Sequence, residues 1–98
     1  MLSFVLASAA AARPVGAYEY VSGGGQSCPT GREAVINAYV YGDWNIYSDF
    51  GLEGFMYNVP FNQLTYAYVY TGHQNITASA AEAENYVDGP VGTACEPV

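Results

Sequence analysis

The sequence predicts a small all-β domain, a sandwich or barrel of short strands with one short C-terminal helix. Runs of β-branched and aromatic residues recur along the chain, and glycine-rich turns or a proline separate them. Ten tyrosines agree with this pattern, because a tyrosine suits a strand whose face is half exposed to water. Closely spaced strands of this kind are typical of sandwiches and barrels.

Five strands are predicted along the chain, and each ends at a turn or break residue. The second strand separates an aliphatic face, Ala34 to Val40 in steps of two, from a face with two tyrosines. We expect the aliphatic face to be buried. The predicted strands cover residues 17–21, 34–41, 44–48, 55–59 and 64–71.

A short helix is predicted over residues 77–86, which are rich in alanine and glutamate. Thr77 or Ser79 would cap its N-terminus, and Glu82 would lie near its first turn. The glycines and proline of residues 88–92 would end it. Cys95 would then lie in a short tail.

The N-terminal residues 1–17 predict a secretory signal. Residues 2–12 form an uncharged apolar run that is too short to span a bilayer, and Val15 and Ala17 have the small-residue pattern of a cleavage site. Cleavage near Ala17 would leave residues 18–98 as a single secreted β domain. The alternative is that residues 1–17 are retained as an apolar arm that packs against a neighbouring subunit.

Two cysteines, Cys28 and Cys95, lie near the two ends of the predicted mature chain. A pair of this kind in an exported protein is usually bridged, so a disulfide is predicted, with two free thiols of a cytosolic protein as the alternative. A zinc site is not expected, because the thiols and His73 lack the close spacing of zinc ligands. Asn75 begins an Asn-Ile-Thr triplet, an acceptor for N-glycosylation.

The charge balance excludes several partners. Nine acidic residues stand against two basic ones, both arginines. Nucleic acid and anionic membrane surfaces are therefore not expected to bind. No nucleophile motif or phosphate-binding loop occurs, and His73 is the only histidine, so the sequence predicts a protein that is not an enzyme.

The stretch around residues 44–70 resembles the βγ-crystallin superfamily. Tyr47, Leu52, Gly54 and Tyr57 follow the aromatic-to-glycine spacing of its Greek-key motif, although Leu52 replaces the usual aromatic residue. The resemblance implies a Greek-key sandwich with a folded hairpin. In that hairpin the tyrosine ring would pack over the turn, and Gly54 would adopt a backbone conformation forbidden to residues with a Cβ.

The resemblance also implies a weak calcium site in the turn that closes the motif. Asn62 and Thr65 would supply its side-chain oxygens. Phe61 and Tyr66 depart from the polar residues that calcium-binding members carry there, so the resemblance implies the fold more than the site. No other cofactor is expected.

Two functions follow from these observations. The first is a small secreted, acidic, non-catalytic protein that binds a protein or cell-surface partner, as an effector, toxin or inhibitor does. The alternative is a structural subunit of an extracellular fibre or coat. Such a subunit would assemble through strand pairing at residues 65–71 and through the apolar arm.

Overall fold

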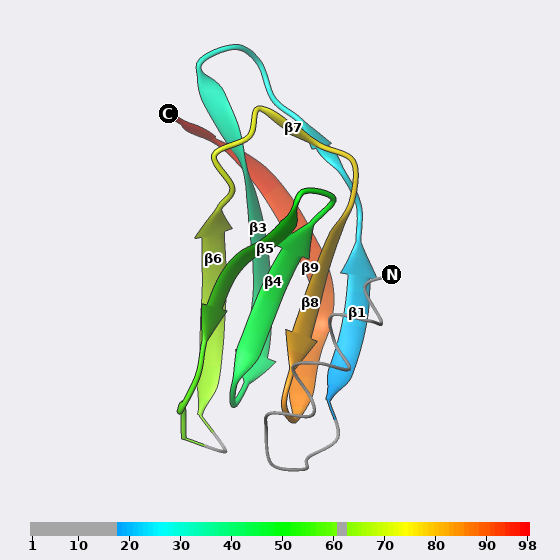
Figure 1. Ribbon diagram of the computed structural model, residues 1–98, viewed down its shortest axis with the longest axis vertical. Coiled ribbons are helices and arrows are strands. Elements are labelled where there is room, and N and C mark those ends of the chain that lie inside the picture. Colours follow the sequence, from blue (N-terminus) through cyan, green and yellow to red (C-terminus); the bar gives the residue numbers. More distant parts are fainter. Residues whose placement is uncertain (1–17, 61–62) are drawn as a thin grey trace.

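The computed structural model describes residues 18–60 and 63–98, and these residues form nine β-strands and no helix. Two antiparallel sheets face each other, and a short two-stranded ribbon lies at one end of them (Figure 1). The all-β prediction is confirmed. The strands are β1 (Glu19–Gly23), β2 (Gln26–Ser27), β3 (Arg32–Tyr41), β4 (Trp44–Ser48), β5 (Gly51–Met56), β6 (Leu64–Tyr70), β7 (Asn75–Ile76), β8 (Ser79–Ala83) and β9 (Tyr86–Pro97).

The four-stranded sheet has the order β1-β8-β4-β5, and the three-stranded sheet has the order β6-β3-β9. The ribbon pairs β2 with β7. The chain crosses between the two large sheets after β3, returns after β5, and crosses again after β8. Among the strands of the described residues, β4 and β5 are the one consecutive pair that is hydrogen-bonded together, and they form a hairpin.

The core lies between the two large sheets. Ala34, Ile36, Ala38 and Val40 of β3 point inward and are at most 2% exposed, as predicted for the aliphatic face of this strand. They belong to one apolar cluster with residues of the facing sheet, which are Trp44, Ile46, Ala81 and Ala83. Alanine supplies much of this cluster, so the core is built largely from small side chains.

The predicted C-terminal helix is wrong. Its central residues form β8, which pairs with β1 on one side and with β4 on the other. The hydroxyl of Ser79 donates to the carbonyl oxygen of Gly24, 2.7 Å away, so it does not cap a helix. Intrinsic helix propensity is weak compared with tertiary packing, and small alanines suit a central strand that is buried at every position.

The prediction that residues 88–92 end an element is also wrong, because β9 runs through them. Gly92 lies opposite Asn37 and Asp88 lies opposite Tyr39, so three residues of β9 face the single residue Ala38. This bulge accommodates Pro90, and Gly89 within it has a φ of 86°. The ladder resumes on both sides, which keeps β9 in one sheet.

Several strand boundaries differ from the predicted ones. Strand β5 covers the residues after the turn at 49–50, so the strand predicted for 55–59 was placed too late.

Residues 1–17 and the calcium candidate Asn62 lie outside the described residues. Within the described ranges, no helix has the length and apolar character needed to cross a membrane.

Candidate functional site

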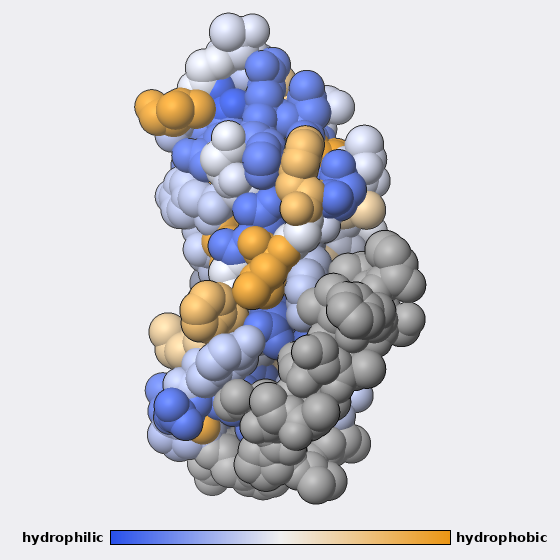
Figure 2. All heavy atoms as spheres, in the orientation of Figure 1, coloured by the Kyte–Doolittle hydropathy of each residue, from blue (hydrophilic) through white to orange (hydrophobic). Residues whose placement is uncertain are grey.

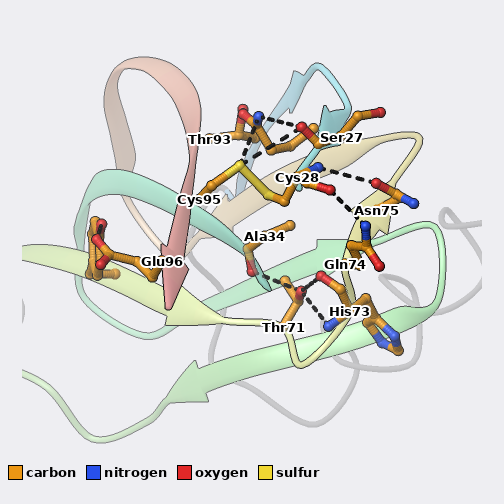
Figure 3. Close-up of a disulfide and its surroundings, with 12 residues drawn as sticks. Ser27, Cys28, Ala34, Thr71, His73, Gln74, Asn75, Thr93, Cys95 and Glu96 are labelled. Carbon is orange, nitrogen blue, oxygen red and sulfur yellow. Dashed lines mark hydrogen bonds between the residues drawn. A yellow bond between two sulfur atoms is a disulfide. The ribbon is translucent and has the colours of Figure 1, made fainter. Parts of the chain in front are cut away.

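The predicted disulfide is present. Cys28, which follows β2, and Cys95 of β9 are joined with an S–S distance of 2.13 Å across a sequence separation of 67 (Figure 3). The Cys28 amide donates to the carbonyl oxygen of Gln74 and to Oδ1 of Asn75, both 3.1 Å away. The bridge therefore fastens the β2–β7 ribbon to the three-stranded sheet.

The predicted glycosylation acceptor, Asn75, lies on β7 with an exposed side chain. Its Oδ1 atom already accepts the Cys28 amide, as Figure 3 shows. The amide of Thr77 donates to Oδ1 of Asp49, 2.7 Å away. The triplet therefore belongs to a hydrogen-bonded end of the molecule, and its glycosylation stays a prediction.

Gly54 does not have the backbone conformation expected for the motif. The positive φ of this hairpin is at Gly51, at 119°, where the chain leaves the turn. A Cβ on Gly54 would lie 2.8 Å from Cγ1 of Val69, a residue of β6 in the other sheet. Gly54 is therefore required because two strands approach closely, and not because of its φ.

Tyr47 also has a different role from the predicted one. The backbone of Tyr47 lies opposite Ala80 in the β4–β8 pair, yet the hydroxyl of Tyr47 donates to Oε1 of Glu82, 3.1 Å away. Glu82 lies opposite Asn45, so the hydroxyl of Tyr47 is directed away from the turn at 49–50. The tyrosine bonds to the next strand of the sheet.

Glu82 is the centre of a buried polar network on the outward face of the four-stranded sheet, the face turned away from the core. Its Oε1 atom also accepts from Nδ2 of Asn45 at 3.0 Å, and Oδ1 of Asn45 accepts from the hydroxyl of Tyr57 at 2.6 Å. Glu82 and Asn45 are each 1% exposed. Sequence reasoning missed this network, since it placed Glu82 on a helix.

The network changes the titration of its members. Burial raises the pKa of Glu82 above its ordinary value, and the hydrogen bonds from Asn45 and Tyr47 offset part of that shift. The pKa of Tyr47 is raised as well, first by burial and then by the nearby Glu82 carboxylate. A perturbed carboxyl is a catalytic candidate in general. Because Glu82 is almost fully buried, we assign it to packing.

The outward face of the three-stranded sheet is different, because it carries tyrosines that water reaches. We call it the tyrosine face, and it comprises Tyr39 and Tyr41 of β3 with Tyr66, Tyr68 and Tyr70 of β6. Tyr39, Tyr66 and Tyr70 are 46%, 50% and 53% exposed. These tyrosines share the face because alternate residues of a strand point to the same side, and Tyr39 pairs directly with Tyr66.

The rings of the tyrosine face form a continuous row. Ring centroids are 4.7 Å apart for Tyr39 and Tyr66, 5.8 Å for Tyr66 and Tyr68, and 5.7 Å for Tyr68 and Tyr70. These separations lie within the range of favourable aromatic pairs. The row is therefore ordered by its own ring contacts, while three of its four side chains remain about half in water.

Carboxylates border this row. The hydroxyl of Tyr68 donates to Oε2 of Glu96 on β9. That hydrogen bond is the main reason why the pKa of Tyr68 is raised to about 12. Asp88 lies opposite Tyr39, and Glu33 lies opposite Glu96. The tyrosine face therefore has an acidic margin along β9 and at the start of β3.

A second exposed apolar surface lies on β5 and the turn before it. Phe50, Leu52, Phe55 and Met56 are between 48% and 60% exposed, and Figure 2 shows apolar side chains along this strand. Phe50 stacks on the ring of His73, with centroids 3.8 Å apart. Nε2 of His73 lies 3.4 Å from Oε2 of Glu53. His73 therefore packs in a local contact at one end of this surface.

The predicted calcium ligands are not brought together by the described residues. Thr65 lies on β6 opposite Val40, on the inward side of the strand, and is half-buried. In residues 18–60 and 63–98, no group of three or more His, Cys, Asp or Glu side chains is arranged to hold a metal ion. The calcium site stays a prediction.

Comparisons with protein-family models, with curated proteins and with solved structures give no match to this chain. The likeness of residues 44–70 to the βγ-crystallin motif stays a prediction. Of the two outward faces, the tyrosine face carries the larger set of exposed aromatic side chains.

Proposed function

We propose that this protein is a secreted, non-catalytic binding protein whose partner is recognised by the tyrosine face. The observation that carries this proposal is the exposure of Tyr39, Tyr66 and Tyr70, each about half in water, within one ordered row. Large exposed aromatic surfaces mark interaction sites. Tyrosine is also enriched among the residues that contribute most to binding energy at protein interfaces.

Secretion is supported by the disulfide between Cys28 and Cys95, because such bonds persist in oxidising compartments. It is supported further by the apolar run of residues 2–12. The intact mass of the native protein, with and without reductant, tests both features. We expect a chain that begins near Tyr18 and gains two hydrogens on reduction. A full-length chain with two free thiols would contradict secretion.

The Greek-key part of the fold prediction is supported by the chain path. Strand β3 pairs with β6, although β4 and β5, which lie between them in the sequence, are in the other sheet. The contact between Gly54 and Val69 places β5 beside β6 at the sheet edges. The last strand of the run β3 to β6 therefore lies beside the first, which is the return connection found in a Greek key.

The alternative function, a subunit of an extracellular assembly, is favoured by one observation. Strand β6 is an edge of its sheet and pairs only with β3 in the described part of the chain. Leu64–Tyr70 contains no charged residue and no proline, which are the usual protections of an edge against pairing with another chain. A copy of this protein could add a strand there.

A photocrosslinking amino acid, p-benzoylphenylalanine, distinguishes these functions when it is placed at position 66 or position 52. Tyr66 and Leu52 are both 50% exposed but lie on opposite sheets, so position 52 is the matched control. Irradiation in the producing cells or their medium should give a crosslinked product with a different protein at position 66 and none at position 52.

Two other results would count against this proposal. A product with twice the mass of the chain would favour the assembled subunit. The absence of a product at position 66, or a product only at position 52, would show that the tyrosine face is not the recognition surface.

A further inference from the structure

We infer that the partner of the tyrosine face is cationic, a segment of extended chain in which arginine or lysine recurs at every second residue. This inference rests on the proposed function, because it assigns a partner class to the same surface. It is carried by the charges around the tyrosines and by the spacing of their rings.

The charges on this side of the sheet have one sign. Three acidic residues occupy outward positions of this sheet. Asp88 of β9 lies opposite Tyr39, and Glu33 of β3 lies opposite Glu96 of β9. The outward positions of β3, β6 and β9 carry no lysine or arginine in the described residues. Arg32 lies on the other side of β3, because it is two residues from the buried Ala34. The surface therefore complements positive charge.

The exposed tyrosine rings complement the same kind of group. A guanidinium or ammonium over the face of a tyrosine is attracted by the ring quadrupole. The Gly72 amide donates to Oε1 of Glu33, 2.7 Å away, and the hydroxyl of Tyr68 donates to Glu96. The second bond holds the Glu96 carboxylate against the row of rings, and the first fixes Glu33, which lies opposite Glu96. A cation bound there would meet both an aromatic face and a fixed negative charge.

The ring spacing favours an extended chain. Along β6, the centroids of Tyr66, Tyr68 and Tyr70 follow one another at 5.8 Å and 5.7 Å. Side chains on one side of an extended peptide recur at about 6.7 Å. A peptide that lies along β6 with a cation at alternate positions would therefore place successive cations near successive rings.

Other occupants fit the surface less well. A second copy of this chain would bring the same three carboxylates to the interface, and each copy has a net charge of −7. Nucleic acid could stack on tyrosines, but its phosphates would be repelled by the acidic margin. Charge complementarity selects the cationic segment.

The probe is a synthetic peptide with alternating arginine and serine, and its binding is measured by calorimetry and by chemical shifts of the tyrosine rings. The control peptide has glutamate in place of arginine. We expect the arginine peptide to bind and to change the chemical shifts of the rings of the tyrosine face. Its affinity should fall about tenfold when the salt concentration rises from about 20 to about 300 mM. The glutamate peptide should not bind.

Two protein variants test the rings. Replacing Tyr39, Tyr66 and Tyr70 together by serine should lower the affinity for the arginine peptide at least about tenfold, because the three most exposed rings of the row are lost. Replacing the same three residues by phenylalanine keeps the rings and should leave the affinity within about twofold. Equal losses in both variants would overturn the inference.

A pair of charge variants tests the margin. Glu33→Gln with Asp88→Asn removes two charges beside the tyrosines, whereas Asp49→Asn with Glu84→Gln removes two charges elsewhere. The first pair of substitutions should lower the affinity for the arginine peptide about fivefold, and the second pair by less than about twofold. Equal effects would show that only net charge matters, and would overturn the inference.

Failure of this inference can be separated from failure of the proposed function. If the arginine peptide does not bind but crosslinking at position 66 still captures a partner, the tyrosine face is a binding surface and its partner is not cationic. If neither occurs, both proposals fall.

Discussion

The two sheets of this protein use the same residue type on their outward faces in opposite ways. On the four-stranded sheet, the hydroxyl of Tyr47 is bonded to Glu82 and the residue is 2% exposed. On the three-stranded sheet, Tyr66 and Tyr70 are about half exposed. Tyrosine therefore contributes to packing on one sheet and remains available for binding on the other.

The side-chain partners explain the difference, and the position of the strand in its sheet does not. The hydroxyl of Tyr47 donates to Glu82 on the neighbouring strand β8, and both side chains are buried. Tyr39 lies on β3, which has a neighbour on each side as β4 has, yet it is 46% exposed. Its ring packs against Tyr66 on the same outward face. The rings of the tyrosine face therefore contact one another and remain about half in water.

The largest expected effect comes from the disulfide, which fastens the three-stranded sheet to the β2–β7 ribbon. Cys28→Ser with Cys95→Ser should lower the free energy of unfolding by about 4 kcal/mol, because the bridge closes a long loop. Denaturant unfolding of the two proteins measures this loss, and the reduced wild type serves as control. A loss below about 1 kcal/mol would show that the sheets hold the ribbon without the bridge.

The network on the four-stranded sheet should come next. Glu82→Ala leaves Nδ2 of Asn45 and the hydroxyl of Tyr47 buried without their acceptor, which should cost about 2 kcal/mol. Glu82→Gln keeps an acceptor oxygen and is the matched control, with an expected change below about 1 kcal/mol. Equal losses in the two variants, measured by denaturant unfolding, would show that the carboxylate charge matters more than the acceptor.

The same residue predicts a pH dependence. The pKa of Glu82 is raised in the folded protein, so the fold binds its proton more tightly than the unfolded chain does. Its contribution to stability is fully present below the unfolded pKa and is lost as pH rises through the folded pKa. Glu82→Gln should therefore lose less stability than the wild type between pH 4 and pH 7. The free energy of unfolding is measured against pH for both proteins, and parallel curves over this range would contradict a raised pKa of Glu82.

A smaller effect is expected where the two sheets meet at their edges. Gly54→Ala places a Cβ 2.8 Å from Cγ1 of Val69 and should cost about 1 to 2 kcal/mol by overpacking. Val69→Ala removes the methyl groups that a Cβ at position 54 would meet. Gly54→Ala should therefore cost less stability in a chain that already carries Val69→Ala than in the wild type. If the double variant loses the sum of both single effects, then Gly54 is required for another reason.

The smallest effect on stability is expected on the tyrosine face. Tyr66→Ser should change the free energy of unfolding by less than about 1 kcal/mol, because half of the side chain is already in water. Tyr47→Ser, at a buried position, should cost at least about 3 kcal/mol by cavity formation. Similar losses at the two positions, measured by thermal unfolding, would remove the distinction between the sheets.

Much of the fold could be predicted from local patterns. Residues 34–41 of β3 are predicted as a strand because they are rich in β-branched and aromatic residues and separate an aliphatic face from a face with tyrosines. The bridge between Cys28 and Cys95 followed from the number of cysteines and their place in an exported chain. The strand can be predicted from a few consecutive residues, and the disulfide from the number of cysteines in the chain.

Other features could not be predicted, for identifiable reasons. Strand β8 has the composition of a helix, and its state depends on pairing with β1 and β4, which are distant in the sequence. Gly54 was expected to have a special φ, whereas the reason for a glycine is Val69 in another sheet. The network of Glu82 joins residues 35 and 37 positions apart, which no local pattern reveals.

Alternation and charge are local properties, so the sequence is sufficient to predict an acidic, tyrosine-rich β protein. Which tyrosines are buried and which face water depends on the side chains that the pairing of distant strands brings beside them. Tyr47 is bonded to Glu82 of β8 and buried, whereas Tyr39 and Tyr66 meet each other on the outward face of the other sheet and stay about half exposed.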